Sequence, residues 1–376
     1  MICKDKEGRH SKAFNKPPCL TSSKGEPRRV GFEFELSGLK LEPLAEEIVK
    51  VFGGEIKRHE PLSFDIENTE FGTFCVEMDS QMVQKAAVDL TDKPLSKASP
   101  NDEASKAANG ILATSSEWYD KASRKAGKTA TSFVTGVAEL VVPYEIVTPP
   151  LPFSAFFQLA ELIEILHHLE AEGTRSSLVN AFGMHINPEI YSDDIAEIRD
   201  VLRAFLLLYP FLKSEMGIDL SRRMLTYIDP FPKDYIKLVL ALEYAPDLKG
   251  FISDYIRYNP TRNRALDLLP LFAHLAEEHL GQLASIDESL VKARPTFHYR
   301  LPNCEVDNAS WNIDRDWNLW VEVERLAVDK DRLKALSEEY LAFLDGPLNG
   351  LFGRDWVAHV RANISANQPE GEPLDG

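Results

Sequence analysis

Apolar and polar residues alternate from Val30 to Leu36, where every second residue is valine, phenylalanine or leucine. This period of two is typical of a strand with one face in a hydrophobic core. Glu33 and Glu35 lie on the opposite face, with Cα atoms roughly 6.5–7 Å apart. Two carboxylates at that spacing can bind one divalent metal ion or two neighbouring ions. The alternative is a solvated strand face with two spaced acids, which is the commoner case for a single pair.

Similar patterns predict the other elements. Apolar residues at helical spacing predict a helix over residues 41–52, which Gly53 and Gly54 end. A hairpin is expected between Phe64 and Asp79, turning around Asn68 and Gly72. Further strands are predicted at residues 138–147, 181–187 and 296–301, and an amphipathic helix at residues 153–170.

The order of these elements predicts an α+β fold. Strands lie on both sides of a mostly helical middle region at residues 192–283, and a Trp-rich helical segment ends the chain. This grouping favours α+β over an alternating βαβ fold. We expect a flexible basic arm at residues 1–27, a single catalytic domain at residues 28–360 with a low-complexity insertion at residues 83–132, and a flexible tail at residues 361–376.

Composition narrows the class of protein. The chain has 376 residues, of which 44% are apolar, so it can bury a substantial core. Its formal net charge of -17 argues against a nucleic-acid partner, because phosphate binding needs clustered Lys and Arg. We expect no membrane partner and a cytoplasmic location, since no apolar run approaches the ~18 residues of a membrane span and the first residues are charged. The four cysteines form no CxxC motif, so neither a disulfide framework nor a thiolate metal site is indicated.

Polar pairs recur on the predicted strands. A single pair is usually an ordinary sheet face, but five pairs on core strands are costly to bury unless metal ions or arginines neutralise them. Acids in this number, with few histidines, favour Mg²⁺ or Mn²⁺ and leave zinc as a minor possibility. The pairs are Glu33/Glu35, Glu77/Asp79, Glu139/Glu145, His185/Asn187 and His298/Arg300.

These segments, in this order, resemble the putative amidoligase family of the glutamine synthetase and glutamate–cysteine ligase superfamily. The resemblance spans about residues 28–345. Each motif alone is weak, but five in order are fairly specific. They are Gly31-Phe32-Glu33-Phe34-Glu35, Val76-Glu77-Met78-Asp79, Glu145-Ile146-Val147-Thr148-Pro149-Pro150-Leu151, Gly183-Met184-His185-Ile186-Asn187 and His298-Tyr299-Arg300-Leu301-Pro302-Asn303.

The resemblance implies a glutamine synthetase-like curved, mainly antiparallel sheet backed by helices. It also implies an ATP-dependent ligase that activates a carboxylate as an acyl phosphate and joins it to an amine, with small molecules or peptides as substrates and Mg²⁺ or Mn²⁺ as the metal. The residue types suit phosphoryl transfer, which needs positioning and charge neutralisation. In that scheme the resemblance assigns Glu33, Glu35 and Glu145 to metal, His185 to the ATP phosphates and Arg300 to the phosphoryl group. The full set of candidate residues is His185, His298 and Arg300 for catalysis, His185, Asn187, Arg264 and Arg300 for ATP, and Glu33, Glu35, Glu145 and Asp79 for metal.

Two positions depart from the superfamily pattern. Asn187 stands where a second histidine is frequent, and His298 stands where a glutamate is frequent. The loss of a carboxylate at position 298 leaves one metal site in question, and Glu139, Asp79 or Glu305 are candidate substitutes. Two alternatives therefore stay open: a catalytically degenerate protein that binds nucleotide or peptide, and a metal-dependent hydrolase. The sequence does not determine the oligomeric state.

Overall fold

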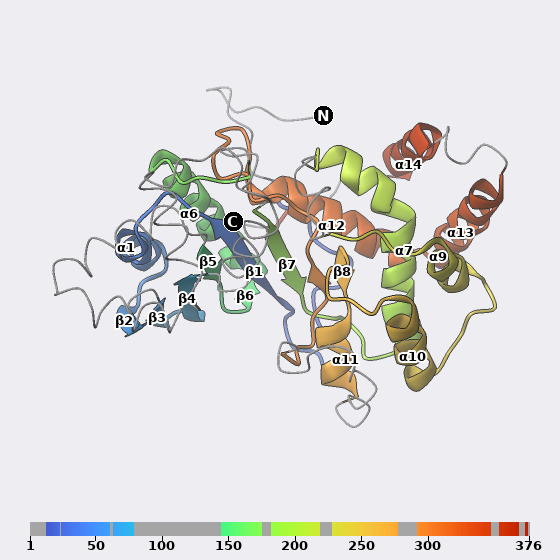
Figure 1. Cartoon of the computed structure of the whole chain (residues 1–376), viewed down its shortest axis with the longest axis horizontal. Helices are drawn as coiled ribbons and strands as arrows, with labels where there is room; N and C mark the ends of the chain where they lie inside the picture. The colour runs from blue at the N-terminus through green and yellow to red at the C-terminus, as the bar shows by residue number, and fades with distance from the viewer. Residues whose placement is uncertain are drawn as a thin grey trace, which may run out of the picture.

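The fold is built around one antiparallel sheet whose strands differ in length (Figure 1). The computed structural model describes residues 13–22, 24–60, 63–78, 144–174, 182–218, 228–276, 292–346, 353–367 and 373–374. Within these ranges nine strands form the sheet in the order β2-β3-β4-β5-β1-β7-β9-β8, and β6 also pairs with β1. The strands are β1 (Arg29–Leu36), β2 (Glu55–Glu60), β3 (Ser63–Thr69), β4 (Gly72–Met78), β5 (Tyr144–Val147), β6 (Leu151–Pro152), β7 (Met184–Pro188), β8 (Leu266–Asp267) and β9 (His298–Tyr299).

Helices pack on one face of this sheet and extend beyond its β8 end. Helix α1 packs against β3, α6 packs against α1 and α12, and α7 packs against α12, α13 and α14. The helices are α1 (Leu41–Phe52), the short 3-10 helix η1 (Phe153–Ala155), α6 (Phe156–His168), α7 (Ile195–Glu215), α9 (Lys233–Leu240), α10 (Leu248–Tyr258), α11 (Leu269–Leu275), α12 (Ile313–Val328), α13 (Lys330–Asp345) and α14 (Gly353–Asn367). Among the described residues no helix is both long enough and apolar enough to span a bilayer.

Strand β1 separates the core from a polar face. Phe32 and Phe34 are fully buried on the helix side, and the Phe32 ring lies 5.3 Å from that of Phe156 on α6. Further along the same face, Tyr299 of β9 lies 5.2 Å from Trp320 of α12. Since strand side chains alternate, Glu33 and Glu35 project from the other face. The alternation in the sequence therefore predicted the two faces of β1 correctly.

A buried ion pair fixes the start of β1. Arg28 donates two hydrogen bonds to Glu324 on α12, at 2.9 and 2.6 Å, and both side chains are essentially inaccessible. Trp320 donates a third hydrogen bond to the same carboxylate at 2.8 Å. Breaking one partner of such a pair is costly, because the other charge stays buried. The pair thus holds β1 against α12, one residue before the strand begins.

The α+β class and the antiparallel sheet are confirmed, since all strand pairs in the described part of the chain are antiparallel. Helix α1 has the predicted bounds and ends at Gly53, whose φ is 71°. The β3–β4 hairpin also turns where expected. Asn68 has φ 60° and Gly72 has φ 126°, values that asparagine tolerates and glycine adopts freely.

The structure describes parts of the segments predicted to be a flexible arm and tail. Within residues 1–27, Phe14 is fully buried and its ring lies 5.5 Å from that of Phe156. Asn15 pairs with Pro373, so part of the arm lies beside part of the tail. Helix α14 continues to Asn367, seven residues into the predicted tail. The flexibility of both segments and the domain bounds stay predictions. The insertion at residues 83–132 lies outside the described residues.

Candidate functional site

Glu33 is the centre of a buried polar cluster on the face of the sheet opposite to the helix side. Its register partner on β7 is His185, and their side chains meet with His185 Nδ1 2.6 Å from Glu33 Oε2. Asn187 donates from Nδ2 to Glu33 Oε1 at 2.9 Å, and Arg294 donates to the same oxygen at 3.0 Å. Both carboxylate oxygens are therefore engaged, which offsets the cost of burying this acid.

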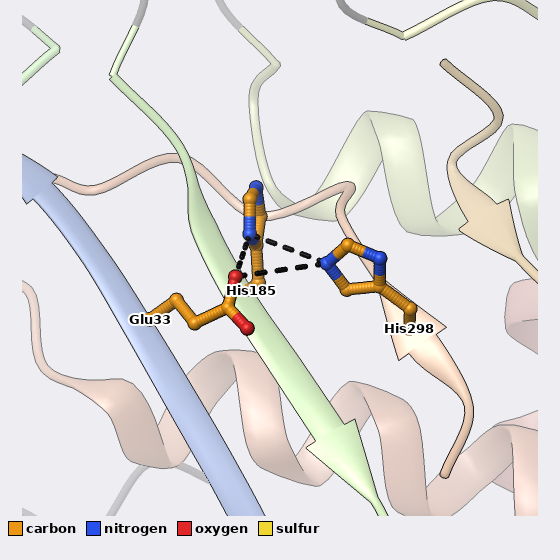
Figure 2. Close-up of side chains that lie close together, drawn as sticks. All are labelled: Glu33, His185 and His298. Atoms are coloured by element: carbon orange, nitrogen blue, oxygen red, sulfur yellow. Dashed lines mark hydrogen bonds and ion pairs between the residues drawn. The ribbon is translucent and has the colours of Figure 1, made fainter. Parts of the chain in front are cut away.

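His298 of β9 completes the inner cluster. Its Nε2 lies 3.4 Å from His185 Nδ1 and 3.7 Å from Glu33 Oε2. The two imidazole rings are nearly perpendicular, with centroids 4.9 Å apart. Figure 2 shows the three side chains converging from β1, β7 and β9 on a common point.

The cluster shifts the ionisation of its members. Burial alone would raise the pKa of Glu33, but hydrogen bonds and charge from His185 and His298 hold it well below its ordinary value. Burial lowers the pKa of His185 to about 4, against the opposing effect of Glu33. Burial also lowers the pKa of His298, but the nearby carboxylates of Asp267 and Glu33 outweigh it and the net shift is upward. Glu33 is thus an anion between one neutral and one more basic histidine.

Each histidine has a carboxylate near its second ring nitrogen. His185 Nε2 lies 3.8 Å from Glu35 Oε1, and His298 Nδ1 lies 3.8 Å from Asp267 Oδ2. Asp267 is fully buried and its other oxygen accepts from the Leu269 amide at 3.0 Å. This arrangement orients both imidazoles with one nitrogen toward Glu33 and the other toward an acid.

Three arginines, Arg262, Arg294 and Arg300, lie near the cluster. Arg300 donates to the Arg262 carbonyl at 2.6 Å. Burial lowers the pKa of Arg262, and Asp267, Arg300, Glu33 and Arg294 all act on it electrostatically. Three guanidinium groups are therefore concentrated beside Glu33 and Asp267, and such a concentration suits an anionic ligand such as phosphate.

A row of carboxylates continues the same face in the opposite direction. The register sets Glu35 of β1 opposite Glu145 of β5, and Glu145 opposite Glu77 of β4. Directly opposite side chains have Cβ atoms roughly 4.5–5.5 Å apart, and like charges at that distance are destabilising. A cation bound along the row would offset this repulsion.

A cavity of about 430 Å³ opens beside Glu33. Its walls combine apolar surface with charged side chains of both signs. The lining residues are Arg29, Gly31, Phe32, Glu33, Val147, Thr148, Pro150, Asn187, Glu189, Arg294, Pro295 and Thr296. The volume is within the range of small-molecule sites.

The structure brings together most of the residues assigned from the sequence. Glu33, Glu35, His185, Asn187, His298 and Arg300 lie on one face, and Glu145 lies opposite Glu35. Arg264 is not brought to this cluster. Its guanidinium donates to the Pro230 carbonyl and lies 5.7 Å from the centre of the Phe231 ring. Asp79 and Glu139 lie outside the described residues, and Glu305 contacts Asn308 and Arg315.

Arg294 and Asp267 were not assigned as site residues from the sequence. Arg294 precedes a proline outside any strand, and Asp267 belongs to a strand of only two residues. Neither position has a periodic pattern to indicate its direction. The one available signal was that both fall within residues 28–345, the span that resembles the amidoligase family.

The donor atoms show which metals the two parts of the face fit. Around Glu33 they are two imidazole nitrogens and one carboxylate oxygen, which do not match the oxygen ligands that Mg²⁺ takes in proteins. The row of Glu35, Glu145 and Glu77 offers only carboxylates, the ligand type that a hard cation prefers, but in this structure their ligand atoms do not all lie within 4.8 Å of one another.

No curated protein and no solved structure matches this chain. One family model, described as a putative amidoligase enzyme, matches residues 26–322. That span contains every strand of the sheet and every side chain of the polar face described in this section. The chain therefore belongs to the putative amidoligase enzyme family.

Proposed function

We propose that this protein is an ATP-dependent ligase that joins a carboxylate to an amine through an acyl phosphate. Membership of the amidoligase family supports a ligase. The proposal adds the nucleotide, the intermediate and the substrate class.

One observation carries the proposal: the polar face is ordered by charge across neighbouring strands. Glu77, Glu145 and Glu35 form its acidic end, Glu33 with two histidines forms its middle, and arginines form its other end. Phosphoryl transfer from ATP needs a cation near the phosphates and positive side chains near the transferring group. A single sheet face offers carboxylates that can bind the cation and arginines that can contact the transferring group.

The chemistry proceeds in two steps. A substrate carboxylate oxygen attacks the γ-phosphorus of ATP, giving an acyl phosphate and ADP. The amine then attacks the acyl carbon, phosphate leaves with the electron pair of the C–O bond, and loss of the amine proton gives the amide. Mg²⁺ bound with ATP at the acidic end supplies charge neutralisation for the phosphates.

The side chains of this chain have separate tasks in the scheme. Arg300 and Arg262 neutralise the negative charge on the oxygens of the transferring phosphoryl group. Asn187 and His185 hold Glu33 in one orientation through hydrogen bonds of 2.9 and 2.6 Å. The cavity binds the substrates, and Arg29 or Arg294 in its wall recognises the carboxylate.

The first test is calorimetric titration of ATP into the purified protein with and without Mg²⁺. We expect magnesium-dependent binding that is lost in the Glu33→Ala/Glu35→Ala double variant. A matched control is Glu42→Ala/Glu46→Ala, which removes two exposed acids from α1 and leaves the face intact. Absence of ATP binding to the folded wild type would refute the ligase.

A second test detects the acyl phosphate. Hydroxylamine attacks acyl phosphates to give hydroxamates, so carboxylates can be screened with ATP and hydroxylamine by colour with ferric iron. Hydroxamate formation that requires both ATP and a particular carboxylate supports the intermediate. ATP binding without hydroxamate or phosphate release from any carboxylate would favour the degenerate nucleotide-binding protein instead.

A metal-dependent hydrolase is the second candidate, and the donor set of Glu33, His185 and His298 favours it. Two histidines and one glutamate also form the ligand set of catalytic zinc sites in several hydrolases. This candidate predicts metal-dependent hydrolysis of amides or esters without ATP. It gives Arg300 and Arg262 no task, which is why we place it second.

A further inference from the structure

We infer that Glu33, His185 and His298 form a site for a borderline transition-metal ion, of which Zn²⁺ is the best fit, in preference to Mg²⁺. The inference concerns the protein without nucleotide and does not depend on the proposed ligase activity. It also revises the role expected of His298, whose presence suggested a lost metal ligand. In the structure this histidine supplies a donor of a different kind.

The geometry of the three donor atoms fits one ion. Tetrahedral ligands with bonds of roughly 2.0–2.1 Å have donor atoms roughly 3.3 Å apart. His298 Nε2 lies 3.4 Å from His185 Nδ1 and 3.7 Å from Glu33 Oε2. Only the separation of 2.6 Å between His185 and Glu33 must open, by less than 1 Å, as a hydrogen bond is replaced by two metal bonds.

The surroundings of the histidines are an independent argument. Histidines that bind metals nearly always donate from the second ring nitrogen to a carboxylate, a carbonyl or water. Both histidines here have a carboxylate oxygen 3.8 Å from that second nitrogen, Glu35 for His185 and Asp267 for His298. His185 directs Nδ1 toward the centre of the cluster, and His298 directs Nε2 toward it. In each ring the other nitrogen lies toward a carboxylate.

Two of these atoms are buried without a hydrogen bond. His298 Nδ1 and Asp267 Oδ2 have no hydrogen-bond partner among the described residues, and both residues are at least nine-tenths buried. An ion at Nε2 would fix the proton of His298 on Nδ1, where a small movement gives it Asp267 as acceptor. The ion therefore satisfies a pair of polar atoms that the site otherwise leaves 3.8 Å apart.

Ligand chemistry selects the metal. Imidazole nitrogen suits Zn²⁺, Cu²⁺, Fe²⁺ and Ni²⁺, whereas Mg²⁺ prefers oxygen and gives up its water reluctantly. A glutamate at position 298 would give a site with two carboxylates and one imidazole. The histidine thus moves the preference of this site from a hard cation to a softer one. An ion held by Glu33 lies beside the cavity, because Glu33 is part of its wall.

The test uses the full chain after treatment with a chelator, with Co²⁺ as an optical probe. We expect Co²⁺ to produce visible d–d absorption at one ion per chain, Zn²⁺ to displace it stoichiometrically, and 10 mM Mg²⁺ to leave the signal unchanged. His298→Glu should weaken Zn²⁺ binding at least 10-fold relative to Mg²⁺. Asp267→Asn should weaken it by about 10- to 100-fold while leaving the three donors in place.

The matched control is His59→Ala. His59, Asp65 and Glu67 form a second cluster with metal-binding geometry, but it lies on the outer strands and His59 is exposed. The control should keep the tight site. Displacement of Co²⁺ by 10 mM Mg²⁺, or loss of the tight site in His59→Ala rather than in the His298 variant, would overturn the inference. If His298→Glu does not fold, His298→Asn removes the same donor with a neutral side chain, and the competition in the wild type decides the metal preference by itself.

Discussion

The polar sheet face has an inner half around Glu33, His185 and His298 and an outer half formed by Glu35, Glu145 and Glu77. The two halves differ in how their negative charges are neutralised. In the inner half, Glu33 is 8% exposed and every hydrogen-bonding oxygen has a partner from His185, Asn187 or Arg294. In the outer half, Glu77 is exposed and lies directly opposite Glu145. Burial forces the inner acid to be neutralised by protein groups, whereas solvent and mobile cations can neutralise the outer row. The inner half is therefore preorganised by its own side chains, and we propose that a bound cation completes the outer half.

The largest difference should appear in activity when one acid of each half is neutralised. Glu33→Gln is expected to lower ATP-dependent phosphate release by about 100-fold or more, because it removes a metal-binding carboxylate oxygen and the anion that orients His185, Asn187 and Arg294. Glu77→Gln, the matched change in the outer half, should lower it by less than about 10-fold, because neighbouring carboxylates and water can replace one ligand. Steady-state phosphate assays with the best carboxylate–amine pair measure both. Equal losses of phosphate release would show that the two halves are equally important for activity.

Asn187→Asp should destabilise the inner half in the absence of metal. The change removes the donor to Glu33 Oε1 and sets a second negative charge beside it, with an expected cost of about 2 kcal/mol in the free energy of unfolding. A divalent ion bound between the two carboxylates should recover most of that loss. Urea denaturation with EDTA and then with Mn²⁺ measures both values.

Asn308→Asp is the control for that experiment. Asn308 donates to Glu305 at 2.9 Å, so the same pair of residue types is changed at another place. We expect it to lose stability without recovery by Mn²⁺. Equal recovery in both variants would mean that the metal acts on the protein as a whole and not on Glu33.

The outer half should respond to loss of charge in the opposite direction. Glu77→Gln is expected to raise the free energy of unfolding by about 0.5 kcal/mol in EDTA, since it relieves repulsion from Glu145 directly opposite. High salt should remove the gain by screening it. A gain that persists at 1 M NaCl, or a loss of stability at low salt, would contradict the electrostatic reason.

Cys75 offers the smallest effect and the most local one. Burial, followed by the charges of Glu77, Asp65 and Glu145, raises the pKa of its thiol to about 12. A raised thiol pKa keeps the reactive thiolate scarce, so the rate of alkylation should rise steadily from pH 8 to pH 10 without a plateau. Glu77→Gln should lower the pKa and speed alkylation about 2- to 5-fold at pH 9.

The internal control for this measurement is Cys19. The pKa of this thiol is also raised by burial, but the acids acting on it are Glu324 and Glu197, so its rate should not change in Glu77→Gln. Iodoacetamide labelling followed by peptide mass spectrometry reports both cysteines in one sample. A parallel change in both rates would indicate a global loosening of the fold.

The comparison of the two halves also shows what the sequence could predict. The alternation around Glu33, the helix over residues 41–52 and the β3–β4 hairpin are local patterns, and the structure confirms them. The position of Glu145 opposite Glu35 and Glu77 needs the strand order, which local patterns do not contain. The metal roles of these acids stay a prediction.

The contacts of the inner half were harder to predict from the sequence, because they depend on tertiary structure. Whether His298 faces Glu33 is decided by the pairing of Ile186 with Tyr299, a register between strands far apart in the chain. Arg294 reaches Glu33 from an irregular segment, and Arg264, which has a similar sequence setting, turns instead toward Pro230. The direction of an arginine outside regular structure cannot be deduced from periodicity. The sequence thus predicted the residue types of the site better than their partners.

The separation of the three donors along the chain sets a limit on when the site can form. Glu33 and His185 are 152 positions apart, and His185 and His298 are 113 positions apart. At ribosomal rates of roughly 5–20 residues per second, roughly 15–50 s pass between synthesis of the first donor and the last. Strand β1 waits through the first 152 of those positions for β7, its partner on one edge, and long-range sheet pairing is slow to form. During refolding, the visible absorption of bound Co²⁺ would therefore appear with completion of the sheet, later than helix formation, and would distinguish finished molecules from collapsed ones.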